Sequence, residues 1–122
     1  MEKKKKTILI VDDDQSSSAK TKAFLEGKGY EVIYALDGEA ALTVLETNIP
    51  ELILLDIIMP RIDGFTIARR IRFEERTKRV PIIVCSAQEE MKDLFAIEGI
   101  KDYVLKPIDN EVLLSLVRKY LG

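Results

Sequence analysis

The stretch Glu51 to Gly64, ELILLDIIMPRIDG, decides the fold. It opens with the apolar run Leu52–Leu55, which has the length and continuity of a strand covered on both faces. The run ends at Asp56, and the chain then breaks at Met59-Pro60. An unpaired carboxylate in an apolar interior is costly or takes up a proton, so Asp56 needs a compensating partner. Asp56 cannot serve as a helix cap, because Pro60 interrupts the chain before the next helix.

Similar apolar runs alternate with helical periodicity along the rest of the chain. Strands are predicted at Thr7–Val11, Tyr30–Ala35, Leu52–Leu55, Pro81–Cys85 and Asp102–Leu105. Helices are predicted over Ser16–Lys28, over Asp37–Glu46, after Asp63-Gly64, over Glu89–Glu98 and after the cap Asp109. This alternation predicts an α/β fold, with a parallel sheet covered by helices on both faces.

The helical segments differ in how apolar their inward faces are. Three have clear apolar stripes: Ala40, Ala41, Val44 and Leu45; Phe65, Ile67, Ala68 and Ile71; Val112, Leu113, Leu116 and Val117. The first helix is weaker, because Ser17, Lys20 and Thr21 stand where hydrophobes are common. Its packing is expected from Ala19, Ala23, Phe24 and Leu25. We therefore predict a thin contact there, or an altered partner surface.

Length and composition restrict the class of protein. A length of 122 residues predicts one domain, 1–122, with residues 1–6 as a flexible basic leader. The net charge is −2, so no overall field draws nucleic acid or anionic lipid, and no apolar stretch approaches the length of a membrane span. The single cysteine, Cys85, is expected to be a buried hydrophobe, which suits a reducing cytoplasm. The absence of histidine excludes serine-histidine chemistry and most zinc sites.

Polar groups follow four of the predicted strands. They are Asp12-Asp13-Asp14, Asp56, Ser86 and Lys106. In a parallel α/β sheet the carboxyl ends of the strands share one edge, where ligands bind. Several carboxylates there repel by about 4 kcal/mol per pair at 4 Å and an effective dielectric near 20. Either some of these carboxylates stay protonated or a divalent cation lies among them, and an all-oxygen site favours magnesium or manganese.

These residues together are typical of phosphoryl transfer. A lysine and a hydroxyl beside the cation supply charge and a hydrogen bond to a tetrahedral dianion, and an aspartate can be the nucleophile. Each residue also has an ordinary alternative. The three adjacent aspartates could form a turn and helix cap, Ser86 could cap a helix, and Lys106 could be a solvated loop lysine. Capping alone does not explain why all of them follow strands.

The motifs ILIVDD, LILLDIIMPRIDGF, PIIVCSA and DYVLKP, in this order, resemble the receiver domain of bacterial two-component response regulators. The resemblance covers essentially the whole chain. It implies a doubly wound, flavodoxin-like (βα)5 fold with strand order 2-1-3-4-5. It further implies a cis bond between Lys106 and Pro107, since X-Pro bonds are where the cis isomer is cheap.

The resemblance also implies a role for each site residue. Asp56 corresponds to the phosphoacceptor, Asp13 to the direct magnesium ligand and Asp12 to its neighbour acting through water. The backbone carbonyl of Ile58 falls where a further metal ligand is expected. Ser86 matches the switch hydroxyl, Lys106 the lysine that pairs with the phosphoryl group, and Tyr103 the aromatic that turns inward on activation.

The resemblance implies a cytoplasmic signalling switch, not an enzyme acting on an external substrate. The phosphodonor is a sensor histidine kinase or a histidine phosphotransfer protein, expected to be separate because this sequence has no histidine. Output passes through the face formed by the fourth helix, fifth strand and fifth helix to a downstream protein, without nucleic acid or membrane contact. The expected state is a monomer, with dimerisation on phosphorylation as the alternative.

The segment from Ser86 to Tyr103 is about two residues shorter than receivers usually have, which predicts a short or irregular fourth helix. Two other functions remain open. One is a receiver-like binding module that no longer takes phosphate. The other is a phosphatase of the haloacid dehalogenase type, with Asp12 and Asp14 as a D-x-D motif. The phosphatase needs a further strand-end acid pair after Lys106, where sixteen residues predict one helix, and it leaves Asp56 unexplained.

Overall fold

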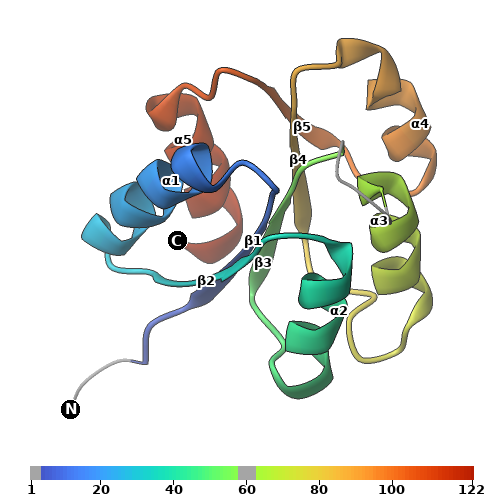
Figure 1. Cartoon of the computed structure of the whole chain (residues 1–122), viewed down its shortest axis with the longest axis horizontal. Coiled ribbons are helices and arrows are strands. Elements are labelled where there is room, and N and C mark those ends of the chain that lie inside the picture. Colours follow the sequence, from blue (N-terminus) through green and yellow to red (C-terminus); the bar gives the residue numbers. More distant parts are fainter. Residues whose placement is uncertain (1–3, 58–62) are drawn as a thin grey trace.

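The computed structural model describes residues 4–57 and 63–122 (Figure 1). Within these residues five strands alternate with five α-helices, and one turn of 3-10 helix precedes the fourth helix. The elements are β1 (Thr7–Val11), α1 (Gln15–Gly27), β2 (Glu31–Ala35), α2 (Gly38–Thr47), β3 (Leu52–Leu55), α3 (Gly64–Phe73), β4 (Ile82–Ser86), η1 (Glu89–Met91), α4 (Lys92–Ile97), β5 (Asp102–Leu105) and α5 (Asn110–Leu121).

The strands form one parallel sheet in the order β2-β1-β3-β4-β5, which confirms the predicted doubly wound fold. In the register of the central strands, Val11 lies between Ala35 on β2 and Leu55 on β3. The residues that follow these strands therefore leave the sheet at one edge, as the alternation predicted.

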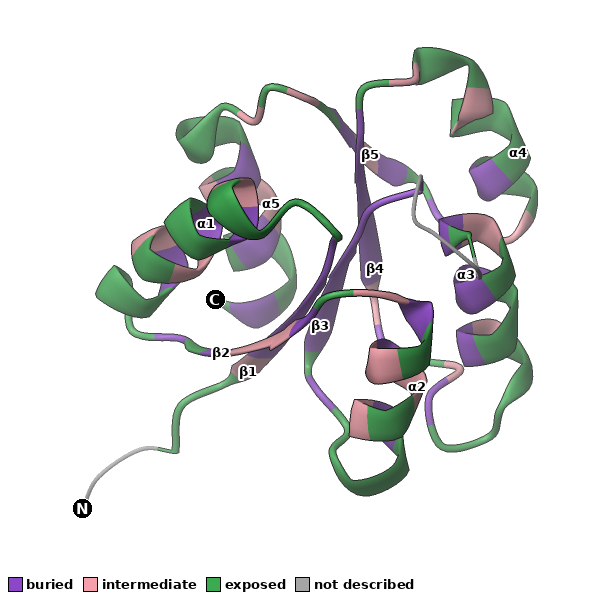
Figure 2. Ribbon diagram, in the orientation of Figure 1, coloured by how far each residue is buried: buried purple, intermediate pink, exposed green. Residues whose placement is uncertain are grey.

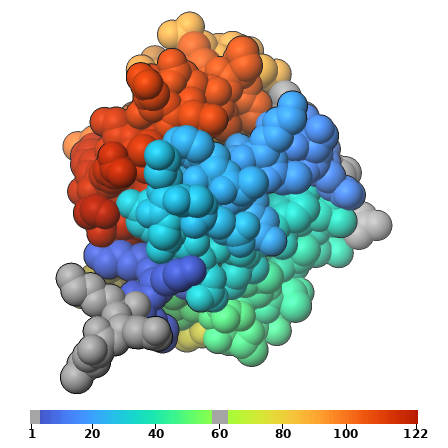
Figure 3. Space-filling view, turned by 90° about the vertical axis from the view of Figure 1, so that its left-hand side faces the viewer, coloured from blue at the N-terminus to red at the C-terminus, as the bar shows by residue number. Residues whose placement is uncertain are grey.

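Helices cover both faces of the sheet. Helices α1 and α5 pack on one face, and α2, α3 and α4 pack on the other (Figure 1). The β3 run LILL is buried throughout, because both layers cover it (Figure 2). In the side view of Figure 3, α1 and α5 lie against each other at the molecular surface. The two-sided burial explains why the central strands are apolar without alternation.

Aspartate caps begin four of the helices. The side chains of Asp14, Asp37, Asp63 and Asp109 accept backbone N–H groups in the first turns of α1, α2, α3 and α5. Such caps satisfy amides that have no partner within the helix. Helix α4 has no side-chain cap and only six residues, preceded by η1. The prediction of a short or irregular fourth helix is confirmed.

Two predictions of inward-facing residues were wrong. On α1, Leu25 is buried as predicted, but Ala19 and Ala23 are exposed, and Ser18 and Thr21 are buried instead. The helix is rotated so that small polar residues face the sheet next to the acidic loop, and the Thr21 hydroxyl is satisfied by the Ser17 carbonyl at 3.2 Å.

On α5, Val112 is half exposed, whereas Leu113 and Val117 are fully buried. Leu113, Val117 and Leu121, spaced at four residues, form the inner face of this helix. Cys85 is buried, as predicted. In the described part of the chain, no helix has the length and apolar character needed to cross a bilayer.

Candidate functional site: an acidic cluster at the strand ends

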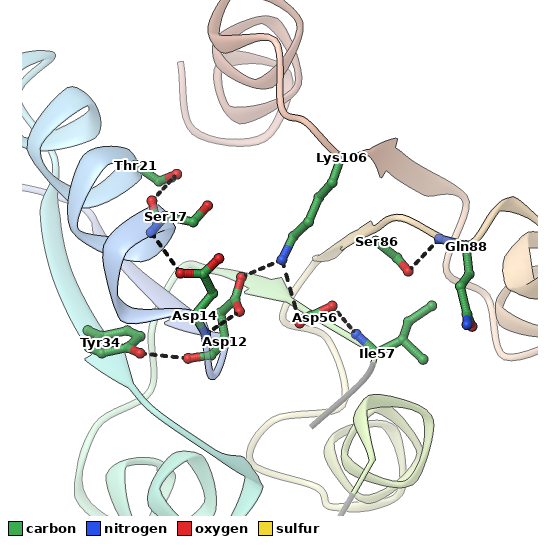
Figure 4. A network of polar contacts seen from close by, with 10 residues as sticks. All are labelled: Asp12, Asp14, Ser17, Thr21, Tyr34, Asp56, Ile57, Ser86, Gln88 and Lys106. Atoms are coloured by element: carbon green, nitrogen blue, oxygen red, sulfur yellow. Dashed lines mark hydrogen bonds and ion pairs between the residues drawn. The ribbon is translucent and has the colours of Figure 1, made fainter. Parts of the chain in front are cut away.

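Three strands deliver the charged residues of the site to one point. Asp12 and Asp13 follow β1, Asp56 follows β3 and Lys106 follows β5. One carboxylate oxygen from each of Asp12, Asp13 and Asp56 lies within 4.8 Å of the other two. Figure 4 shows the side chains of Asp12, Asp56 and Lys106 pointing toward one another. The predicted convergence of strand ends is thus present.

The three consecutive aspartates have different environments. Asp14 is exposed and caps α1 through the Ser17 amide at 3.1 Å. Asp12 is buried; its Oδ1 accepts the Asp14 N–H at 2.9 Å and its Oδ2 pairs with Lys106. Asp13 is exposed on the solvent side of the cluster. The capping alternative therefore applies to Asp14, and not to the other two.

Asp56 is buried at 8% exposure. Its backbone N–H continues the ladder to the Val11 carbonyl at 2.9 Å, and its Oδ1 accepts the Ile57 N–H at 2.8 Å. Burial raises the pKa of Asp56 to about 6; the nearby Lys106 opposes this rise and the Asp12 carboxylate adds to it. Burial thus disfavours the ionised form of Asp56, and a cation bound by the three aspartates would stabilise that form.

Lys106 is the compensating partner that the sequence required for Asp56. Its Nζ lies 2.7 Å from Asp12 Oδ2 and 3.5 Å from Asp56 Oδ2. Burial lowers the pKa of Lys106, but the two carboxylates raise it by more, so the ammonium stays protonated. The bond between Lys106 and Pro107 is cis, as expected. Lys106 is therefore not a solvated loop lysine.

Ser86 and Tyr103 both form hydrogen bonds with the backbone of Gln88. Ser86 Oγ accepts the Gln88 N–H at 3.0 Å, and the Tyr103 hydroxyl donates to the Gln88 carbonyl. The Tyr103 ring packs against Phe95 of α4, with 6.2 Å between ring centroids. Ser86 is buried at the end of β4 and does not cap η1. The backbone of Gln88 thus connects Ser86 to Tyr103, the two residues predicted to form the switch.

Two residues beside the acidic cluster, Gly64 and Tyr34, were not identified as site residues from the sequence. Gly64 begins α3 where a Cβ atom would lie 2.1 Å from the Asp56 carbonyl oxygen, so only glycine fits. Tyr34, on β2, donates its hydroxyl to the Asp12 carbonyl at 2.7 Å. The Asp63-Gly64 turn was a visible signal for Gly64. Tyr34 had none, because its position depends on the pairing of β1 with β2.

The donor set fits a hard divalent cation. The cluster offers only carboxylate oxygens, two of its three residues are buried, and Asp56 is destabilised as an anion. Magnesium and manganese prefer such ligands. The predicted fourth contributor, Ile58, lies outside the described residues.

The phosphatase alternative finds no support in this geometry. Of the described residues after Lys106, those in regular structure form the single helix α5, which supplies no further strand-end acid pair. Asp12, its required nucleophile, has both oxygens engaged by Asp14 and Lys106. Asp56, which has no role in that mechanism, is one of the three carboxylates of the cluster.

Comparison with known proteins agrees with the geometry. The family model for the response regulator receiver domain matches residues 8–118. Protein PilH of Pseudomonas aeruginosa is 32% identical over 105 residues, covering 84% of this chain and 87% of PilH. Response regulator PleD of Caulobacter vibrioides is 36% identical over 99 residues, which are 80% of this chain but only 22% of PleD. This chain therefore spans about a fifth of PleD.

Among solved structures, the chemotaxis response regulator CheY4 of Vibrio cholerae superimposes with a TM-score of 0.89 and 28% identity, covering 96% of this chain and 99% of CheY4. Receiver domains bind Mg²⁺ at an acidic pocket, are phosphorylated by histidine kinases and act on downstream targets, as signalling proteins without turnover of an external substrate. The acidic cluster of Asp12, Asp13 and Asp56 fits their phosphorylation site. By its sequence motifs, strand order and family match, the chain belongs to the receiver domains of two-component response regulators.

Proposed function

We propose that residues 1–122 form a single receiver domain in which Asp56 accepts a phosphoryl group from a phosphohistidine outside this sequence. The observation that carries the proposal is the position of Asp56, a buried carboxylate that lies beside those of Asp12 and Asp13 and 3.5 Å from the Lys106 ammonium. An Asp56 oxygen forms a bond to phosphorus as the bond from the imidazole nitrogen to phosphorus breaks. The imidazole keeps the electron pair of that bond, and Asp56 becomes an acyl phosphate.

The remaining site residues would hold the metal ion or stabilise the negative charge of the phosphoryl group. Mg²⁺, or Mn²⁺, would neutralise the transferring phosphoryl oxygens when bound. Asp13 and Asp56 would hold it directly, with the Ile58 carbonyl as a further ligand. Asp12 would act through water, since both of its oxygens already have protein partners. Lys106 supplies a positive charge to the phosphoryl oxygens.

Ser86 and Tyr103 are proposed as the switch. The Ser86 hydroxyl accepts from the Gln88 N–H, which leaves its own proton for a phosphoryl oxygen. Movement of Ser86 toward that oxygen would pull on Gln88, whose carbonyl holds Tyr103. The coupling therefore passes through one peptide segment to the ring that packs against α4. Such a shift changes the population of two arrangements of this face.

The output face is proposed to be α4, β5 and α5. These elements expose large apolar side chains, namely Ile97, Leu105 and Val112. A downstream protein that covers them gains apolar burial. We propose cytoplasmic signalling, for which the buried free thiol of Cys85 suits a reducing compartment. The monomer is the proposed ground state.

The test is incubation with acetyl phosphate, followed by intact mass measurement. With Mg²⁺ the wild-type protein should gain one phosphate, and with EDTA it should gain none. The D56N variant should gain none in either buffer, and D63N is the matched control, because Asp63 is an exposed helix cap. A folded wild-type protein that binds Mg²⁺ but takes no phosphate would instead support the binding module that no longer accepts phosphate.

A further inference from the structure

Tyr34 reaches from β2 to the loop that carries the acidic residues. Its hydroxyl donates to the Asp12 carbonyl oxygen at 2.7 Å, as Figure 4 shows. The N–H of Asp12 donates in turn to the Ala35 carbonyl at 3.1 Å. The backbone of Asp12 is therefore held on both its donor and its acceptor side by two consecutive residues of β2.

The phenol takes the place of a missing ladder bond. The paired register of β1 and β2 ends at Val11 and Ala35. In a parallel ladder, a residue whose N–H binds the Ala35 carbonyl would direct its own carbonyl to the amide two residues further on, at Asp37. There the chain has already turned to cap α2. The side chain of Tyr34 supplies the donor instead.

This bond restrains the peptide group that joins Asp12 to Asp13. The carbonyl of Asp12 and the nitrogen of Asp13 belong to one planar peptide group, so fixing the carbonyl fixes the plane from which Asp13 departs. Burial raises the pKa of Tyr34, and the carboxylates of Asp12, Asp13 and Asp14 raise it further. The phenol is therefore protonated and a donor at neutral pH.

We propose that Tyr34 is a positioning residue for the metal site, which it serves by orienting the Asp12–Asp13 peptide. This inference rests on the proposed function, because it assumes that the acidic cluster binds Mg²⁺. Partners outside the ligand shell that orient ligands typically change metal affinity by about 10-fold or more. Loss of the hydroxyl should therefore weaken Mg²⁺ binding even though Tyr34 touches no ion.

The chain contains a matched control for this bond. Tyr30 lies just before β2, and its hydroxyl also donates to a backbone carbonyl, that of Gly122, at 3.2 Å. Tyr30→Phe thus removes the same kind of bond at the opposite end of the strand. A purely structural role predicts that Y34F and Y30F behave alike.

The experiment is calorimetric titration of the wild type, Y34F and Y30F with MgCl₂, with a thermal melt of each. We expect Y34F to bind Mg²⁺ roughly tenfold more weakly, and Y30F to match the wild type within about twofold. Equal affinity of Y34F and the wild type, or equal weakening in both variants, would overturn the inference. Failure of the wild type itself to bind Mg²⁺ would overturn the proposed metal site, and this inference with it.

Discussion

Lys106 Nζ lies 2.7 Å from Asp12 Oδ2, joining residues 94 positions apart in the chain. Asp56, the proposed phosphoacceptor, is further from the same nitrogen, at 3.5 Å. One ammonium thus partly neutralises two carboxylates that also belong to the proposed metal cluster. Lys106 and a divalent cation therefore compete for the carboxylates of Asp12 and Asp56. The proposed phosphoryl transfer nevertheless needs both positive charges.

Replacing Lys106 should accordingly strengthen metal binding and weaken phosphorylation. Removal of one positive charge within 4 Å of the carboxylates favours Mg²⁺ by roughly 1 kcal/mol or more, about fivefold in affinity. We expect K106Q to bind Mg²⁺ more tightly by calorimetry and to take phosphate from acetyl phosphate more slowly. K119Q is the control, since Lys119 pairs with Asp102 on β5. Weaker Mg²⁺ binding by K106Q would contradict the competition.

Mg²⁺ affinity should fall as the pH drops through about 6. Burial raises the pKa of Asp56 to about 6, so protons compete with the metal below this value. Titrations at pH 7.5, 6 and 5 should show a steep loss of affinity across this interval. An affinity that stays constant down to pH 5 would mean that Asp56 is not a ligand.

Asp56 should also lower the stability of the protein without metal at neutral pH. Its folded-state pKa lies above the unfolded value, so folding favours the protonated form; the penalty is absent below about pH 4 and complete above about pH 6. We expect D56N to be more stable than the wild type by about 1–3 kcal/mol at pH 8 in EDTA, and not at pH 4. Urea denaturation measures this, with D63N as the control. A gain that is independent of pH would assign the effect to packing.

Gly64 should tolerate no side chain. A Cβ atom would lie 2.1 Å from the Asp56 carbonyl oxygen, and backbone must move to make room. We expect G64A to lose about 2–4 kcal/mol of unfolding free energy and to bind Mg²⁺ more weakly, because Asp56 is displaced. G27A is the matched control: Gly27 is also helical, has nothing within 4 Å of its Cβ position, and should gain up to about 1 kcal/mol. Equal stabilities for the two variants would refute the close approach.

The sheet and the convergence of the strand-end polar residues could be predicted from the sequence because those features depend on local patterns. Buried runs such as LILL, aspartate caps and strand-end polar residues each follow from a few adjacent positions. The contacts that were missed depend on register between distant segments. Tyr34 meets Asp12 only because β2 pairs with β1 in one register, and Gly64 meets Asp56 only once α3 has packed.

The rotation of α1 could not be predicted for a related reason. Its sequence has no dominant apolar stripe, so local periodicity does not select a face. The neighbouring sheet does, and it accepts Ser18 and Thr21 in place of Ala19 and Ala23. Similarly, Val112 was predicted to face inward on α5 but is half exposed. The apolar pattern of a helix does not show how much of its surface the neighbouring elements cover.

The most direct test of the central claim is to locate the phosphorylated carboxylate. Borohydride reduces an acyl phosphate at aspartate to homoserine, which marks the site. Trypsin separates Asp12, Asp13 and Asp14, in the peptide 7–20, from Asp56, in the peptide 29–61. After reaction with acetyl phosphate and Mg²⁺, tandem mass spectrometry should find homoserine at position 56. Homoserine at position 12, with none at 56, would contradict the account and favour the phosphatase chemistry.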